Sequence, residues 1–324
     1  MTFVTVMAWL PMEDNPLVSI LKGLIGACGI SLMCNLLRVC LFVDYTRRTP
    51  AGGTSEKPND DARSMSRLSS GIQFVFLTGV LSLVGSRVSA LIVLEFSLRA
   101  FLASLLFGQE NRPEVTQQFL IQCQFSLGCA LTCSLQFLHG GATHRWLSLL
   151  LAGGLSWFLS SQGWRLWAHV GRFYPQHCSQ RDCGVCLILV SSGDALLPTL
   201  RRAVVMTFTV GIVAATAVMN QHFLLGAEDL KFWTPMTVSY ILVLLRLLED
   251  EKSRPGGQVM LQSAGLRAGA LVVLLVMVGS WADVMQVLLF FLGESLCLLP
   301  SLSLLRSTAP LEGHKDPHGH SSSE

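Results

Sequence analysis

Long runs of apolar side chains are the feature of this sequence that most restricts its fold. The first run covers residues 17–43, "LVSILKGLIGACGISLMCNLLRVCLFV", and similar runs recur along the chain. A helix needs roughly 20 such residues to cross a hydrocarbon core about 30 Å thick. Hydrophobic residues make up 51% of the 324-residue chain and charged residues only 14%, whereas soluble domains carry about 25% charged residues. We therefore predict an all-α polytopic transmembrane helix bundle in a lipid bilayer.

The runs predict eight or nine spanning helices. Residues 68–107 and 264–305 are each about twice as long as one span, so we divide the first at "GSR", Gly85 to Arg87, and the second near Trp281–Asp283. Merging one short hairpin would give eight spans. The segment 183–198 is apolar only in its first half, and we predict a re-entrant or interfacial piece there. The nine spans are 17–43, 68–84, 88–107, 116–138, 146–166, 202–225, 232–248, 264–282 and 284–305.

The basic residues orient this bundle. With nine spans and the N-terminus outside, fifteen Lys and Arg residues fall in inner loops and three in outer loops, as cytoplasmic loops require. The net charge of +2 is too small to suggest nucleic-acid binding. We interpret residues 1–16 as an N-terminal tail or interfacial segment, 17–305 as the bundle with a flexible cytoplasmic loop at 44–67, and 306–324 as a disordered polar tail.

Charged residues interrupt the apolar stretch "GSRVSALIVLEFSLRAF", residues 85–101. At about 100° per residue, Arg87, Glu95 and Arg99 project within a sector of about 120° of one helix. Glu95 and Arg99 are four residues apart, which is close enough to pair. Because a lone charge at mid-bilayer costs at least ~2.5–3.5 kcal/mol, we expect this face to point into the bundle. Glu294 lies mid-span without a local basic partner, and we consider Arg99 or Arg87 for that role.

The predicted buried polar cluster of Arg87, Glu95, Arg99 and Glu294 has two interpretations. It could line a path for a small polar or anionic solute, which would make the protein a conduit or carrier. Alternatively, its ion pairs only fix helix register, and the protein is a non-catalytic membrane scaffold or assembly factor. A water-accessible cavity that reaches Glu95 or Glu294 would favour the conduit, and a dry, paired cluster would favour the scaffold.

The stretch "HCSQRDCGVC" holds a second candidate group, His177, Cys178, Cys183 and Cys186. The C-x-x-C spacing is typical of a metal site or a redox pair, and these residues would supply the four ligands of zinc. No second C-x-x-C accompanies it in the sequence. Packing, or acylation of a cysteine near the membrane, is the alternative.

Small residues at short helical spacings indicate two helix-packing faces. They are "GLIGACG", with Gly23, Gly26 and Gly29, and "SLGCALTC", with Gly128 and Thr132. The sequence contains no motif of a phosphate-binding loop, a serine hydrolase or a zinc protease. We predict no enzymatic activity and no cofactor, and leave a protein partner or a homo-oligomer open.

Several stretches resemble the transmembrane protein 82 family. They are "VGSRVSALIVLEFSLRA" (84–100), "SLGCALTC" (126–133), "SQRDCGVCL" (179–187), "NQHFLL" (220–225) and "FWTP" (232–235). The resemblance covers most of the chain from the first span to the last. It implies a multi-pass integral membrane protein, and it implies no reaction, substrate or site residue.

Overall fold

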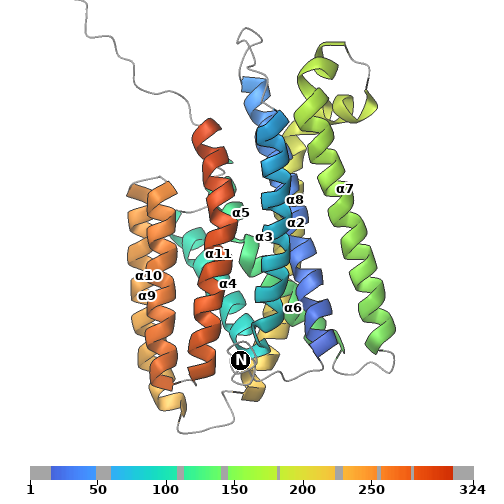
Figure 1. Ribbon diagram of the computed structural model, residues 1–324. Coiled ribbons are helices and arrows are strands. Elements are labelled where there is room, and N and C mark those ends of the chain that lie inside the picture. Colours follow the sequence, from blue (N-terminus) through green and yellow to red (C-terminus); the bar gives the residue numbers. More distant parts are fainter. Residues whose placement is uncertain are drawn as a thin grey trace, which may run out of the picture.

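The computed structural model describes residues 16–48, 60–107, 113–139, 145–180, 183–222, 229–253, 257–278 and 281–308, and every element in these ranges is a helix. Figure 1 shows long helices packed side by side, with α9 and α10 at one edge and α7 at the other. The helices are α2 (Pro16–Arg48), α3 (Asp60–Leu83), α4 (Ser86–Phe107), α5 (Pro113–Gln122), α6 (Gln124–His139), α7 (Arg145–Gln180), α8 (Gly184–His222), α9 (Asp229–Ser253), α10 (Gly257–Val278) and α11 (Trp281–Thr308).

The described helix ends extend into two regions that we predicted to be non-helical. The helix α2 continues to Arg48 and α3 begins at Asp60, so the predicted loop at 44–67 is partly helical on both sides. The helix α11 continues to Thr308, three residues into the predicted polar tail. Residues 1–15, 49–59 and 309–324 lie outside the described part of the chain.

The predicted break at "GSR" is confirmed, because α3 ends at Leu83 and α4 begins at Ser86. The amide of Gly85 donates a hydrogen bond to Gln286 Oε1 of α11 at 3.0 Å. A distant side chain therefore satisfies a backbone donor at this break, as a low-dielectric interior demands. The second predicted break is also confirmed, since α10 ends at Val278 and α11 begins at Trp281.

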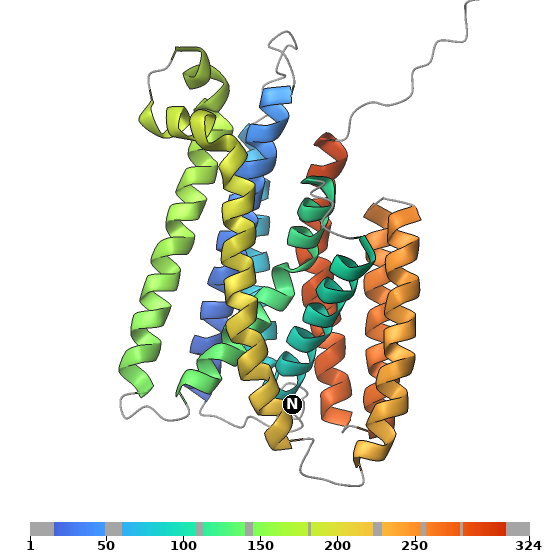
Figure 2. The ribbon, with the colours of Figure 1, turned by 180° about the vertical axis from the view of Figure 1, so that it is seen from behind.

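The predicted span over 116–138 is not one continuous helix. A turn at Cys123 separates α5 from α6, and the two helices run in different directions in Figure 2. The Cys123 amide still donates to the carbonyl of Phe119 at 2.9 Å, and the Leu127 amide donates to the carbonyl of Cys123 at 2.7 Å. Because the backbone hydrogen bonds continue through the bend, few backbone amides and carbonyls are left without a partner in lipid.

The segment predicted as re-entrant or interfacial, 183–198, forms the first part of the long helix α8. Figure 2 shows this part running across one end of the bundle before α8 turns along it. Pro198 lies inside the helix. Proline removes one backbone hydrogen bond and clashes with the preceding turn, which bends a helix.

Five described helices contain segments long and apolar enough to cross a membrane. A shorter apolar segment, Ser70–Leu83, lies in α3. This supports a multi-pass helical membrane bundle without confirming the predicted count of eight or nine. The five segments are Pro16–Asp44, Ser86–Leu106, Ala195–Asn220, Val259–Val276 and Trp281–Leu299.

The distribution of polar and apolar side chains is the reverse of that in a water-soluble protein. Val75, Leu151 and Met206 expose 71%, 67% and 70% of their surface, whereas Arg99 and Glu294 each expose 2%. Large exposed apolar surfaces mark contact with a membrane or a partner. Because such side chains lie along α3, α7 and α8, the outer surface fits a hydrocarbon surrounding.

The two predicted small-residue faces pack against each other. A Cβ atom placed on Gly26 of α2 would lie 3.1 Å from the Gly128 carbonyl oxygen and 3.1 Å from Thr132 Cγ2, both of α6. On the same helix, a Cβ on Gly23 would lie 2.7 Å from the Thr78 carbonyl oxygen of α3. Small residues therefore let α2 approach both neighbours closely, as the packing prediction requires.

We predict that Gly23→Ala lowers the stability of the bundle by about 1–3 kcal/mol, because the new methyl group meets backbone atoms of α3 that cannot rotate away. Thermal unfolding in lipid nanodiscs would measure the change. The matched control is Gly79→Ala, where a Cβ has nothing within 4 Å and alanine favours the helix. Equal unfolding temperatures for the two variants would contradict the packing argument.

Candidate functional site

A buried network of ionised and hydroxyl groups joins four helices in the interior. The Arg267 guanidinium of α10 donates from Nη2 to Glu294 Oε1 of α11 at 2.6 Å. Its Nη1 lies 3.4 Å from Glu95 Oε1 and 3.5 Å from Glu95 Oε2 of α4. The Tyr240 hydroxyl of α9 donates to Glu95 Oε1 at 3.2 Å. We call these four residues, together with Arg99, the charge cluster.

Burial of the charge cluster is nearly complete. Its four ionisable members, Glu95, Arg99, Arg267 and Glu294, expose between 2% and 5% of their surface. A charge taken out of water costs several kcal/mol even after the protein relaxes, unless partners surround it. Two guanidinium groups and two carboxylates carry opposite formal charges in equal number. The cluster can therefore be ionised and still be neutral as a whole.

Apolar and aromatic side chains surround the charge cluster. Arg99 lies over the ring of Phe96 at 5.0 Å from its centroid, and Phe96 packs on Phe208 of α8 at 4.8 Å. Above an aromatic face a cation is attracted by the ring quadrupole. In the same core, the rings of Phe125 and Phe290 meet edge to face, with their centroids 5.4 Å apart. Apolar surroundings of this kind lower the local dielectric constant and so strengthen ion pairs.

Some buried polar atoms of the cluster have capacity for further bonds. Glu294 Oε2 and Arg267 Nε are buried and have no hydrogen-bond partner among the described residues. A buried polar atom without a partner costs about 1–3 kcal/mol, and more when it is charged. The cluster thus has capacity for further hydrogen bonds at these two atoms.

The structure brings together three of the four residues that we predicted for this site. Glu95 and Glu294 both bond Arg267, and Arg99 is buried within electrostatic range of Tyr240. Arg87 does not join them, because it lies exposed in the first turn of α4. The proposal that Arg99 or Arg87 bonds Glu294 is replaced by an observed bond from Arg267.

Sequence reasoning missed Arg267 and Tyr240. Arg267 is a lone charge in the apolar stretch "SAGLRAGALVV", so the rule that singled out Glu95 and Glu294 applies to it equally. Small neighbours, Ala264 and Ala268, are buried beside it and leave room for the guanidinium. Tyr240 carries no such signal, because a tyrosine in a span is common at membrane interfaces.

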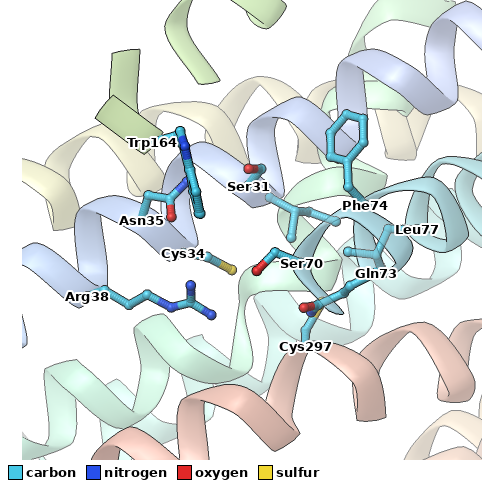
Figure 3. A pocket seen from close by; sticks show the side chains of 11 residues that line it. Ser31, Cys34, Asn35, Arg38, Ser70, Gln73, Phe74, Leu77, Trp164 and Cys297 are labelled. Carbon is cyan, nitrogen blue, oxygen red and sulfur yellow. The ribbon is translucent and has the colours of Figure 1, made fainter. Parts of the chain in front are cut away.

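A small polar cavity lies between α2, α3, α7 and α11. Its volume is about 60 Å³, which suits a few water molecules but not a metabolite. Cys297, three residues beyond Glu294, lines the cavity, and the Arg38 guanidinium points toward Cys34 and Ser70 in Figure 3. The lining residues are Ile30, Ser31, Cys34, Asn35, Arg38, Ser70, Gln73, Phe74, Leu77, Trp164 and Cys297.

The second predicted group is partly assembled at the junction of α7 and α8. Cys183 Sγ and Cys186 Sγ lie 3.4 and 3.5 Å from Nε2 of His169, which we did not predict. The backbone amides of Cys186 and Val185 lower the pKa of the Cys183 thiol from its ordinary value. The side chains of His177 and Cys178 lie outside the described residues.

We predict that Arg267→Met destabilises the bundle by about 3–5 kcal/mol, because it leaves two buried carboxylates without the cation that bonds both. Denaturant titration of the purified protein in detergent micelles would measure this. Arg246→Met is the control, since Arg246 and Glu249 form an ion pair with 74% and 69% of their side chains exposed, and such pairs contribute little. A similar loss of unfolding free energy in both variants would show that position 267 has no special role in stability.

Comparison with known proteins agrees with these observations. No solved structure matches the chain. The family model described as transmembrane protein 82 matches residues 17–318. The match begins in α2 and ends beyond α11, so it covers each helix that carries the charge cluster. The chain therefore belongs to the transmembrane protein 82 family and is a multi-pass integral membrane protein.

Proposed function

We propose that the chain is a non-catalytic membrane scaffold or assembly factor, in which the charge cluster joins α9, α10 and α11 to the other helices. The observation that best supports this proposal is that Arg267 of α10 bonds both Glu294 of the adjacent α11 and Glu95 of α4. Carboxylates that already accept bonds from a guanidinium and a hydroxyl have reduced capacity to bind a solute.

The arrangement of the helices supports this proposal. The helix α10 packs on α9 and α11, whereas α4 packs on α6 and α8. The charge cluster lies where these two groups of helices meet. A paired polar network at such a place favours one relative arrangement of the helices, which is useful in a protein that presents a surface to partners.

We further propose that the chain makes nine passes with its N-terminus outside. If α5 and α6 make one pass together, the helices run alternately up and down the bundle in Figures 1 and 2. The ends of α2, α7 and α9 that carry Arg48, Arg172 and Lys252 then lie on the same face. That face would be cytoplasmic by the positive-inside rule.

The scaffold proposal predicts that the double variant Arg267→Met, Glu294→Leu folds and retains a stably bound partner. The double variant leaves Glu95 and Arg99, which carry opposite formal charges, and hydrophobic replacement of a buried ion pair is often neutral or stabilising by about 1–4 kcal/mol. Arg267→Met alone leaves two buried carboxylates with one guanidinium, so it should lose the partner together with the fold. Affinity purification from native membranes, followed by mass spectrometry, would test this. Wild-type protein that retains no partner would rule the proposal out, as would a folded double variant that loses one.

A conduit for a small polar or anionic solute is the second candidate. Two observations favour it: the buried Glu294 Oε2 and Arg267 Nε lack hydrogen-bond partners among the described residues, and Cys297, one turn beyond Glu294, lines the polar cavity with Arg38. Ionisable residues inside spans often mark such paths. No cluster residue lines that cavity, which is why we place the conduit second.

The conduit predicts solute flux in liposomes that contain the purified chain. The isosteric variant Glu294→Gln should reduce the flux at least about tenfold, because it removes the ionised group while keeping the shape. Arg246→Ala, at an exposed position, should leave the flux unchanged. A panel of inorganic anions and small carboxylates would serve as probes. Absence of flux for all of them in folded wild-type protein would eliminate the conduit and leave the scaffold.

A further inference from the structure

We infer that His169, Cys183 and Cys186 form a Zn²⁺ site at the junction of α7 and α8. This inference is independent of whether the protein acts as a scaffold or a conduit. The three ligand atoms, one imidazole nitrogen and two sulfurs, all lie within 4.8 Å of one another. They come from separate parts of the chain, because His169 lies on α7 and the cysteines lie at the start of α8.

The distances match those around a tetrahedral zinc ion. Zinc–sulfur bonds of about 2.3 Å and zinc–nitrogen bonds of about 2.0–2.1 Å place sulfur and nitrogen about 3.5 Å apart in a tetrahedral site. The observed Sγ···Nε2 distances are 3.4 Å for Cys183 and 3.5 Å for Cys186. Both sulfurs therefore already lie at ligand spacing from the nitrogen.

Two sulfurs lie at nearly the same distance from one imidazole nitrogen. Cys183 and Cys186 both approach Nε2 of His169 in this way. A neutral imidazole nitrogen without a proton has one lone pair, which it can donate to a metal ion. An ion bound between the three atoms would take one lone pair from each of them.

The surroundings suit a structural or exchangeable zinc ion. Cys186 is 1% exposed and belongs to a small apolar cluster with Val39, Val43 and Val170, while His169 and Cys183 are half-buried. The site is thus closed by α2 on one side and accessible on the other. Three protein ligands with an open fourth position are typical of zinc sites that bind water or a further ligand.

The location of the cysteines supports metal binding over a disulfide. Cys183 and Cys186 are not joined by a disulfide in the structure. They lie at the end of the bundle that also holds the end of α2, the face that we propose is cytoplasmic (Figure 1). Cytosolic thiols are kept reduced, so paired cysteines there more often bind metal than form a disulfide.

The experiment uses the full chain in nanodiscs, first stripped of metal with a chelator. Titration with Co²⁺ should give the sulfur-to-cobalt charge-transfer band of a tetrahedral thiolate site, and Zn²⁺ should abolish that band at one ion per chain. His169→Ala, Cys183→Ser and Cys186→Ser should each weaken zinc binding by more than about 100-fold, because even outer-shell partners of a metal contribute about 10–100-fold. Cys40→Ser is the matched control, since Cys40 is a half-buried cysteine of α2 away from the three ligands.

Three results would overturn the proposal. They are the absence of a charge-transfer band in the wild-type chain, equal zinc affinity in the ligand variants and the control, and a Cys183–Cys186 disulfide in freshly purified protein. The wild-type titration does not depend on whether a variant folds. Zinc should also raise the unfolding temperature of the wild type and of Cys40→Ser, but not that of Cys186→Ser.

Discussion

One guanidinium group bonded to two carboxylates is the interaction on which the arrangement of the last three helices depends. Arg267 contacts Glu294 of the adjacent α11 and Glu95 of α4, far away in the sequence. In a medium of low dielectric constant, burying any one of these ions alone would cost much free energy. Pairing with ions of opposite charge offsets that cost. The helices that carry them are therefore constrained to one relative position, more strictly than apolar packing alone would require.

The remainder of the bundle is held together in a different way. In lipid there is no hydrophobic gain from bringing apolar helices together, so close backbone approach and hydrogen bonds must supply the attraction. The glycines of α2 allow this approach to α3 and α6. Side-chain bonds add to it, as when Lys22 of α2 donates to Gln136 Oε1 of α6 at 2.7 Å. The exposed leucines and valines outside then need only to contact the bilayer.

Local signals in the sequence predicted the helical class, two helix breaks and the packing faces. The break at Gly85 follows from span length, and the contact between Gly26 and Gly128 follows from the spacing of small residues. The bend at Cys123 was not predicted, because no glycine or proline marks it and the backbone bonds continue through it. Contacts between residues on different helices were harder to predict. Arg267 is 172 residues from Glu95, and nothing in either local stretch specifies the other.

The partner of the two cysteines at the junction of α7 and α8 was missed for the same reason, because it lies on a different helix. The C-x-x-C spacing identified Cys183 and Cys186, but His169 lies a helix hairpin away from them, and proximity in sequence suggested His177 instead. Folding brings His169 back beside the cysteines because Val170 and Leu189 pack together with Val39 and Val43 of α2. This apolar cluster is small and separate from the main core. A small core supplies little stability by itself, so a metal bonded to both helices would contribute a large share of what holds this end of the hairpin.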